Sequence, residues 1–135
     1  MAAAGAPSQI RRRRLATLKC RKEFLSVRKG NRCSTQAFVL EGRQRTTAAA
    51  AADQARFGFT VARAVGGAVE RNRIRRRLKA AVKCVEMTHA RSDFDYVLVA
   101  RRLALASTFA ELIRELTKAL ERVNRPKRAG HAPGR

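Results

Sequence analysis

The chain has 135 residues, with 31 Lys plus Arg against 10 Asp plus Glu, so its formal net charge is +21. The length suits one domain, and the absence of a run of about 18 apolar residues predicts no transmembrane helix. Self-repulsion of this size destabilises a compact protein, so the charge indicates a polyanionic partner. Nucleic acid is favoured over an anionic membrane surface, because Arg supplies most of the cations and grips phosphate with a planar fork of donors.

The three cysteines, Cys20, Cys33 and Cys84, are odd in number and widely spaced. No CxxC pair is present, which argues against a zinc knuckle or finger. We therefore expect reduced thiols in a cytoplasmic protein.

Both ends of the chain are basic and lack apolar periodicity. Residues 1–12 and 125–135 are therefore predicted to be disordered basic tails around a single domain at 13–124. A first helix is predicted over about residues 17–29, capped by Thr17 and ended by a left-handed Gly30.

A strand is predicted next, over residues 35–40. Residues 41–56, which include five alanines at 48–52, are interpreted as a loose connection of low complexity. Residues 57–62 form the following strand, because bulky and small side chains alternate there with period two. The bulky positions are Phe57, Phe59 and Val61, and the small ones are Gly58, Thr60 and Ala62. The same alternation in the earlier strand predicts that these two strands lie side by side and present a shallow open face next to a packed one.

A connection with two glycines, at residues 63–67, leads to a long helix over about 68–88. The apolar segment 96–100 is typical of a strand that is covered on both faces. A last helix begins at Ser107 or Thr108, since Thr108 and Glu111 have capping-box spacing. The order α, β, β, α, β, α predicts an α+β domain, in the form of a small two-layer α/β sandwich.

The helix at 68–88 has the most informative pattern. Its apolar stripe is Ile74, Leu78, Ala81, Val82 and Val85, and its opposite face is Asn72, Arg76, Lys79 and Lys83, with Arg71, Arg73, Arg75 and Arg77 at the flanks. The like charges repel one another and crowd the positive end of the helix dipole. No acidic residue lies between Arg71 and Lys83, so a surface that holds a polyanion is favoured over a merely solvated face.

Two other interpretations of this helix are weaker. A DNA recognition helix needs a preceding helix and a short turn, whereas a strand and a glycine-bearing loop precede it here. A helix that lies on a membrane surface needs larger apolar anchors than this narrow stripe offers.

At this point the chain resembles the bacterial ribonuclease P protein component. The resemblance covers roughly residues 13–124, and the Arg-Asn-Arg stretch after a strand and glycine loop is its most specific part. The matching segments are Arg14-Leu15, Glu23-Phe24, Val61-Ala62-Arg63, Val65-Gly66, Ala68-Val69, Arg71-Asn72-Arg73-Ile74-Arg75-Arg76 and residues 95–101.

The resemblance implies that a large RNA is the catalyst and that this protein is its accessory subunit, a monomer in a 1:1 complex. Together they would remove the 5′ leader of precursor tRNA, with magnesium in the RNA active site and no cofactor or metal held by the protein. It also implies a ribosomal-protein-like sandwich with a left-handed βαβ crossover, where general rules favour a right-handed one.

The resemblance also implies site residues. Those expected to bind the catalytic RNA are Arg63, Arg71, Asn72, Arg73, Arg75, Arg76, Arg77, Lys79 and Lys83. Those expected to line a cleft for the leader are Phe24, Val39, Thr60 and Ala62. The chain departs from the family pattern at Arg28 and Glu41, where some relatives have aromatic residues, and at Ala64 and Gly67.

Nothing in the sequence indicates catalysis by protein side chains. The only histidines are His89 and His131, and Asp93 and Asp95 suit a turn or cap near a strand start. No nucleophilic triad, P-loop or dinucleotide fingerprint is present. The alternative function is a ribosomal or RNA-assembly protein that assists no reaction, and an independent metal-dependent nuclease ranks third.

Overall fold

The computed structural model describes residues 15–45 and 54–125. The predicted tail at 1–12, the alanine run at 48–52 and all but Arg125 of the second tail lie outside these residues. The elements are β1 (Ala16–Thr17), α2 (Arg21–Val27), β2 (Asn31–Ser34), β3 (Phe38–Gln44), β4 (Arg56–Thr60), the short 3₁₀ helix η2 (Arg63–Val65), α3 (Ala68–His89), β5 (Phe94–Ala100), α4 (Leu103–Ala106) and α5 (Phe109–Val123).

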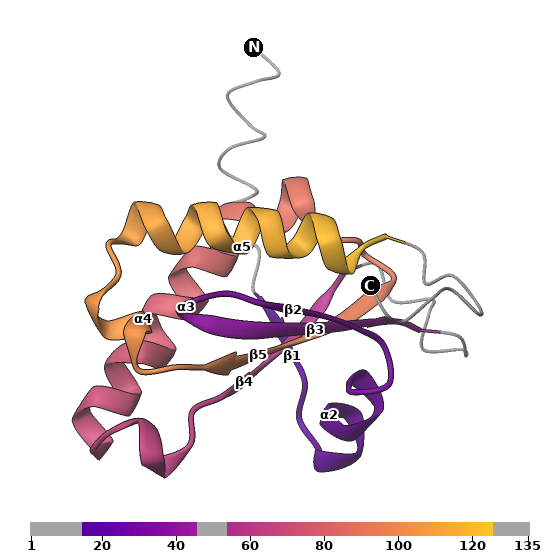
Figure 1. Cartoon of the computed structure of the whole chain (residues 1–135). Helices are drawn as coiled ribbons and strands as arrows, with labels where there is room; N and C mark the ends of the chain where they lie inside the picture. Colours follow the sequence, from indigo (N-terminus) through magenta and orange to yellow (C-terminus); the bar gives the residue numbers. More distant parts are fainter. Residues whose placement is uncertain (1–14, 46–53, 126–135) are drawn as a thin grey trace, which may run out of the picture.

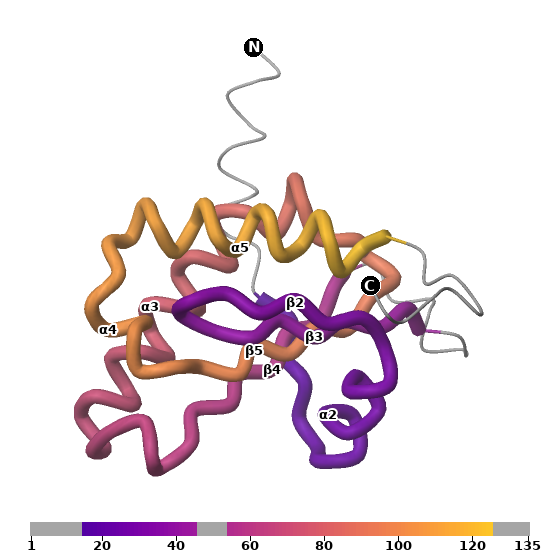
Figure 2. The backbone as a smooth tube through the Cα atoms, viewed as in Figure 1, coloured from indigo at the N-terminus to yellow at the C-terminus, as the bar shows by residue number. Residues whose placement is uncertain are grey.

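The five strands form one mixed sheet in the order β1-β4-β5-β3-β2. β5 lies at its centre, antiparallel to β3 and parallel to β4. β2 and β3 form an antiparallel pair at one edge, and β1 pairs parallel with β4 at the other. Figure 2 traces the crossover that leaves β4, passes through η2 and α3, and returns to the neighbouring β5.

Helices cover the two faces of the sheet unequally. α3 and α5 pack on one face, where the core contains Phe38, Leu40, Phe57, Tyr96 and Leu98 from the strands. Ile74, Leu78 and Val82 of α3 and Leu112, Leu116 and Leu120 of α5 complete that core. Within the part of the chain that the structure describes, α2 is the one helix on the opposite face, and it lies across the sheet from α5 (Figure 1). The predicted α+β sandwich is therefore confirmed. On the α2 side of the sheet Val39, Asp95 and Val97 are buried, whereas Thr60 is exposed.

The prediction for the first helix was only partly right. α2 begins at Arg21 with Cys20 as its N-cap, whereas Thr17 belongs to β1 and pairs with Phe57. The residue after the helix, Arg28, is right-handed, with φ of −59°. Gly30 is not left-handed either. It is needed because an added Cβ would lie 2.0 Å from the carbonyl oxygen of Gly42.

The strand predicted at 35–40 starts later than expected, at Phe38, and the strand that precedes it, β2, was not predicted. Thr35 lies in the turn between β2 and β3, where its hydroxyl accepts a bond of 3.1 Å from the Phe38 N–H. The connection predicted at 41–56 is also wrong at both ends, because β3 continues to Gln44 and β4 starts at Arg56. The long helix, the strand at 96–100 and the last helix were predicted well, although α4 was not foreseen.

Candidate nucleic-acid interface

The start of α3 is held in place by one exposed ion pair. The Glu70 carboxylate accepts a bond of 3.2 Å from the Gly67 N–H and two bonds, of 3.0 and 2.9 Å, from the Arg102 guanidinium. Arg102 also donates to the carbonyl oxygen of Val65 in η2, at 2.7 Å. Arg102, together with the Gly67 N–H, holds the pKa of Glu70 below its ordinary value. A carboxylate at this end of the helix also offsets the cations that crowd the dipole.

The helix then places its charges as predicted. All five apolar residues of the predicted stripe are buried against the sheet. On the outer side, Asn72, Arg73, Arg76, Lys79 and Lys83 are exposed. Their side chains form no ion pair with any described residue, and we call the four cations among them the α3 cationic face. Lys79 additionally lies 5.9 Å above the ring of Phe59, which is within cation–π range.

Three arginines predicted to bind RNA use donors inside the fold. Arg77 donates to the carbonyl oxygens of Ala104, at 3.1 Å, and Ser107, so it ties α3 to the chain around α4. Arg71 donates to the Gly66 carbonyl at 3.1 Å, and Arg75 donates to the Asn72 side chain at 3.2 Å. All three are half-buried. Arg77 in particular is aimed at backbone carbonyls and away from the α3 cationic face, which helical spacing alone did not show.

Two of the residues expected to contact the leader, Thr60 and Ala62, lie at and just after the end of β4. Arg63 is exposed in η2, and the exposed Ala62 precedes it as its N-cap. β4 ends at Thr60, so the strand predicted at 57–62 was two residues too long at its end. Thr60, also exposed, stands opposite Val99, and Val99 stands opposite Val39 on the far side of β5. Thr60 and Val39 therefore share one row on the same face, as the alternation predicted. Contrary to expectation, the two strands are not neighbours, because β5 lies between them. Val39 is only 4% exposed, so it forms a floor rather than a projecting contact.

Phe24 reaches the same face from α2. Its ring belongs to a small apolar cluster with Leu18, Val27 and Val97, and it is half-buried. An added Cβ at Gly58 would lie 2.5 Å from the ring, so the glycine makes room for this aromatic side chain. The row of Gly58 and Val97 adjoins the row of Thr60 and Val99. Phe24 thus stands at the border of the row of Thr60, Val99 and Val39, which we call the exposed row after its exposed member, Thr60.

The acidic residues near β5 form structural contacts. Asp95 is buried and pairs with Arg45 at 2.5 Å and with Arg56 at 2.7 Å. Asp93 accepts a bond of 2.6 Å from the Gln44 amide and lies 3.4 Å from Arg91. No cluster of metal-ligand type occurs among residues 15–45 and 54–125. Arg45 and Arg56 were missed at the sequence level because their partner, Asp95, lies 50 and 39 residues away.

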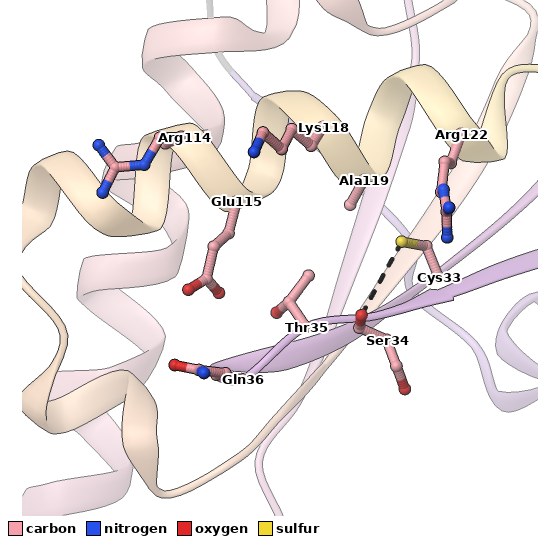
Figure 3. Close-up of a pocket in the computed structure, with 9 residues that line it drawn as sticks. All are labelled: Cys33, Ser34, Thr35, Gln36, Arg114, Glu115, Lys118, Ala119 and Arg122. Carbon is pink, nitrogen blue, oxygen red and sulfur yellow. Dashed lines mark hydrogen bonds between the residues drawn. The ribbon is translucent and has the colours of Figure 1, made fainter.

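A separate cavity of about 500 Å³ lies between α5 and the turn after β2. Figure 3 shows Arg122 reaching toward Cys33 there, with Glu115 at the other end. Cys33 is buried, and no disulfide joins the three cysteines. None of the residues predicted to bind RNA lines this cavity.

Among residues 15–45 and 54–125, no helix combines the length and the apolar composition of a membrane span.

Comparison with known proteins shows which family this chain belongs to. The model described as Ribonuclease P matches residues 13–124. The ribonuclease P protein component of Brucella suis is 42% identical over 113 residues, which cover 81% of this chain and 80% of the relative. The corresponding protein of Gluconacetobacter diazotrophicus is 41% identical over 106 residues, covering 78% of this chain and 88% of the relative.

Solved structures show the same fold. The RNase P protein from Thermotoga maritima superposes with a TM-score of 0.67 at 24% identity, covering 81% of this chain and 98% of that chain. The RNase P protein of Staphylococcus aureus gives a TM-score of 0.65 at 24% identity, with 82% and 100% covered. The sandwich, the family model and the similarity to curated relatives agree, and the chain belongs to the family of ribonuclease P protein components.

Proposed function

We propose that this protein is the RNA-binding accessory subunit of ribonuclease P. It docks on a catalytic RNA through the α3 cationic face and holds the 5′ leader of precursor tRNA over the exposed row of the sheet. The RNA, with its magnesium ions, carries out the cleavage. The protein acts in the cytoplasm as one copy per RNA.

The observation that carries this proposal is the α3 cationic face, which follows the exposed end of β4 in the chain. The α3 cationic face presents four cations with no described acidic partner, and such a surface gains free energy when it releases counterions from phosphates. In the chain, the exposed Ala62 and Arg63 lie between Thr60, at the end of β4, and the start of α3. A single strand would then cross the small side chains of the exposed row while the duplex regions of a large RNA stay on α3. Phe24 supplies a stacking surface that tolerates any base.

Reconstitution tests the proposal. Mixing the protein with a cognate catalytic RNA should increase leader cleavage at low magnesium, whereas the protein alone should cleave nothing. Arg76→Ala should weaken binding and flatten the dependence of log K on log salt by roughly 0.7 to 0.9. Arg114→Ala, which removes another exposed arginine, from α5, is the matched control and should leave the slope unchanged. Equal cleavage with and without protein would sink the proposal.

The alternative function, an RNA-coating protein that assists no reaction, predicts the same steep salt dependence. The family match favours the first proposal, because the relatives are ribonuclease P protein components. The two functions differ in substrate preference. The assembled complex should bind precursor tRNA more tightly than mature tRNA only if the leader is held.

A further inference from the structure

α2 is a small element that must be held from outside. It has seven residues, and Val27 is its only buried one. Helices this short are not stable in isolation, so tertiary contacts fix both its structure and its position. Its N-terminus is capped by Glu23, whose carboxylate accepts bonds from the N–H groups of Lys19 at 2.8 Å and Cys20 at 3.2 Å.

One row of the sheet holds both ends of this helix. In the strand register, Arg43 of β3 and Arg56 of β4 stand on either side of Asp95 of β5. Arg56 donates 3.0 Å to the Glu23 carboxylate at the start of α2. Arg43 donates 2.9 Å to the Ser26 hydroxyl and 3.2 Å to its carbonyl near the end of α2. Two arginines thus grip the helix from the same row.

Asp95 fixes the orientation of the Arg56 side chain toward Glu23. It accepts two bonds from Arg56, from Nε at 2.9 Å and from Nη2 at 2.7 Å, which is the bidentate geometry that fixes a guanidinium plane. Asp95 cannot turn away, because Arg45 also donates to it at 2.5 Å. Arg45 is itself 4% exposed in its side chain and donates to the carbonyl oxygens of Phe94, at 2.9 Å, and Ser92, at 2.5 Å. The chain of contacts therefore runs from the buried interior to the start of α2.

The side chain that this arrangement places is Phe24, which follows Glu23 directly. We propose that Arg43, Asp95 and Arg56 are positioning residues that set where the Phe24 ring stands at the border of the exposed row. This inference rests on the proposed function, in which that row carries the leader. It adds that leader recognition depends on three residues whose contacts are all inside the protein.

A measurement without RNA tests the mechanical part. In Arg56→Ala, amide hydrogen exchange in residues 21–27 should rise by roughly tenfold, while α3 and α5 keep their protection. Glu23→Gln should produce a smaller rise in the same residues, because the amide still accepts from the backbone but loses the ionic attraction of Arg56. Arg114→Ala should change nothing in α2. Unchanged protection of α2 in both test variants would overturn the inference and leave the proposed function intact.

A double-mutant cycle in the reconstituted holoenzyme tests the functional part. Phe24→Ala and Arg56→Ala should each reduce the preference for precursor over mature tRNA by about five- to tenfold, in line with the loss of one stacked base. The double variant should lose no more than Phe24→Ala alone, because Arg56 acts through Phe24. Affinity for the catalytic RNA should match that of Arg114→Ala in every case.

The outcomes separate the two ideas. Additive losses would show that Arg56 acts independently of Phe24 and would overturn the positioning role. Rescue of the preference by Arg56→Lys to the wild-type level would also overturn it, because one ammonium group cannot reproduce the bidentate grip on Asp95. If Phe24→Ala leaves the preference unchanged, the leader part of the proposed function fails and the positioning role falls with it, whatever the exchange data show for α2.

Discussion

Tyr96 is the only tyrosine of the chain, so the ionisation of its phenol can be used to follow unfolding of the protein. Its ring is fully buried and stacked between Phe57, at 4.9 Å between centroids, and Phe94, at 5.5 Å. Its hydroxyl donates 2.5 Å to the Asn124 side chain and accepts 2.9 Å from the Arg91 N–H. Burial raises the pKa of this phenol well above its ordinary value.

Raising the pH from about 9 to about 11 should therefore destabilise the protein through Tyr96. In the unfolded chain the phenol ionises near pH 10, whereas in the folded protein it stays neutral. Because the folded pKa is the higher one, this contribution to stability is complete below about pH 10 and is lost as the pH rises above it. One pH unit beyond the unfolded pKa removes about 1.4 kcal/mol, or roughly 3 to 6 °C of melting temperature for a domain of this size.

Thermal unfolding of the wild type and Tyr96→Phe isolates this effect. The substitution leaves the Asn124 and Arg91 groups without a partner and should cost about 1 to 3 kcal/mol at neutral pH. All other effects of high pH are common to the two proteins and cancel in the difference between their stabilities. The gap in stability should therefore narrow by about 1.4 kcal/mol between about pH 9 and about pH 11. Phenolate absorbance that appears near pH 10 in the folded protein, with a constant gap, would refute the reasoning.

Three further predictions concern local structure. Thr108→Ala should lower the free energy of unfolding by about 1 kcal/mol, as measured by thermal unfolding. The Thr108 hydroxyl accepts a hydrogen bond of 3.1 Å from the Glu111 N–H at the start of α5, and the substitution removes it. An unchanged free energy of unfolding would mean that this cap contributes nothing. Gly30→Ala should cost about 1 to 3 kcal/mol, since its Cβ would strike the Gly42 carbonyl, and a stability equal to wild type would contradict that contact. Backbone donors at Lys19 and Cys20, with Arg56, hold the pKa of Glu23 below its ordinary value. The stability from this carboxylate is therefore present above about pH 4.5 and is lost as the pH falls, so the melting temperatures of wild type and Glu23→Gln should converge in acid; a gap that persists there would count against it.

The sequence predicted the elements whose signals are local. The stripe from Ile74 to Val85 and the Thr108–Glu111 capping box each lie within one helix, and both were confirmed. The edge strand β2 was missed because its four residues contain one buried side chain, Cys33, and no apolar alternation. α4 is a single turn, too short for a helical period to show.

The contacts that organise the site are non-local and were not predictable from spacing. Arg77 belongs by helical position to the RNA-facing set, yet its partners are carbonyl oxygens 27 and 30 residues further along the chain. Arg56 and Asp95 meet only because β4 and β5 are neighbours in the sheet. By contrast, the shared row of Val39 and Thr60 follows from alternation within two strands, once β5 is placed between them.

The central position of β5 has a consequence for how the chain is assembled. Without residues 94–100 the sheet falls into two separate pairs, β1 with β4 and β2 with β3, and strand pairs of this kind are marginal in water. α3 precedes β5 in the chain, so the apolar stripe of this helix has no complete surface to cover until β5 has been synthesised. During translation the cations of α3 are thus displayed before the core can close, and long-range pairing of this kind is slow. We expect the fold of the newborn chain to close only after residues 94–100 have been added.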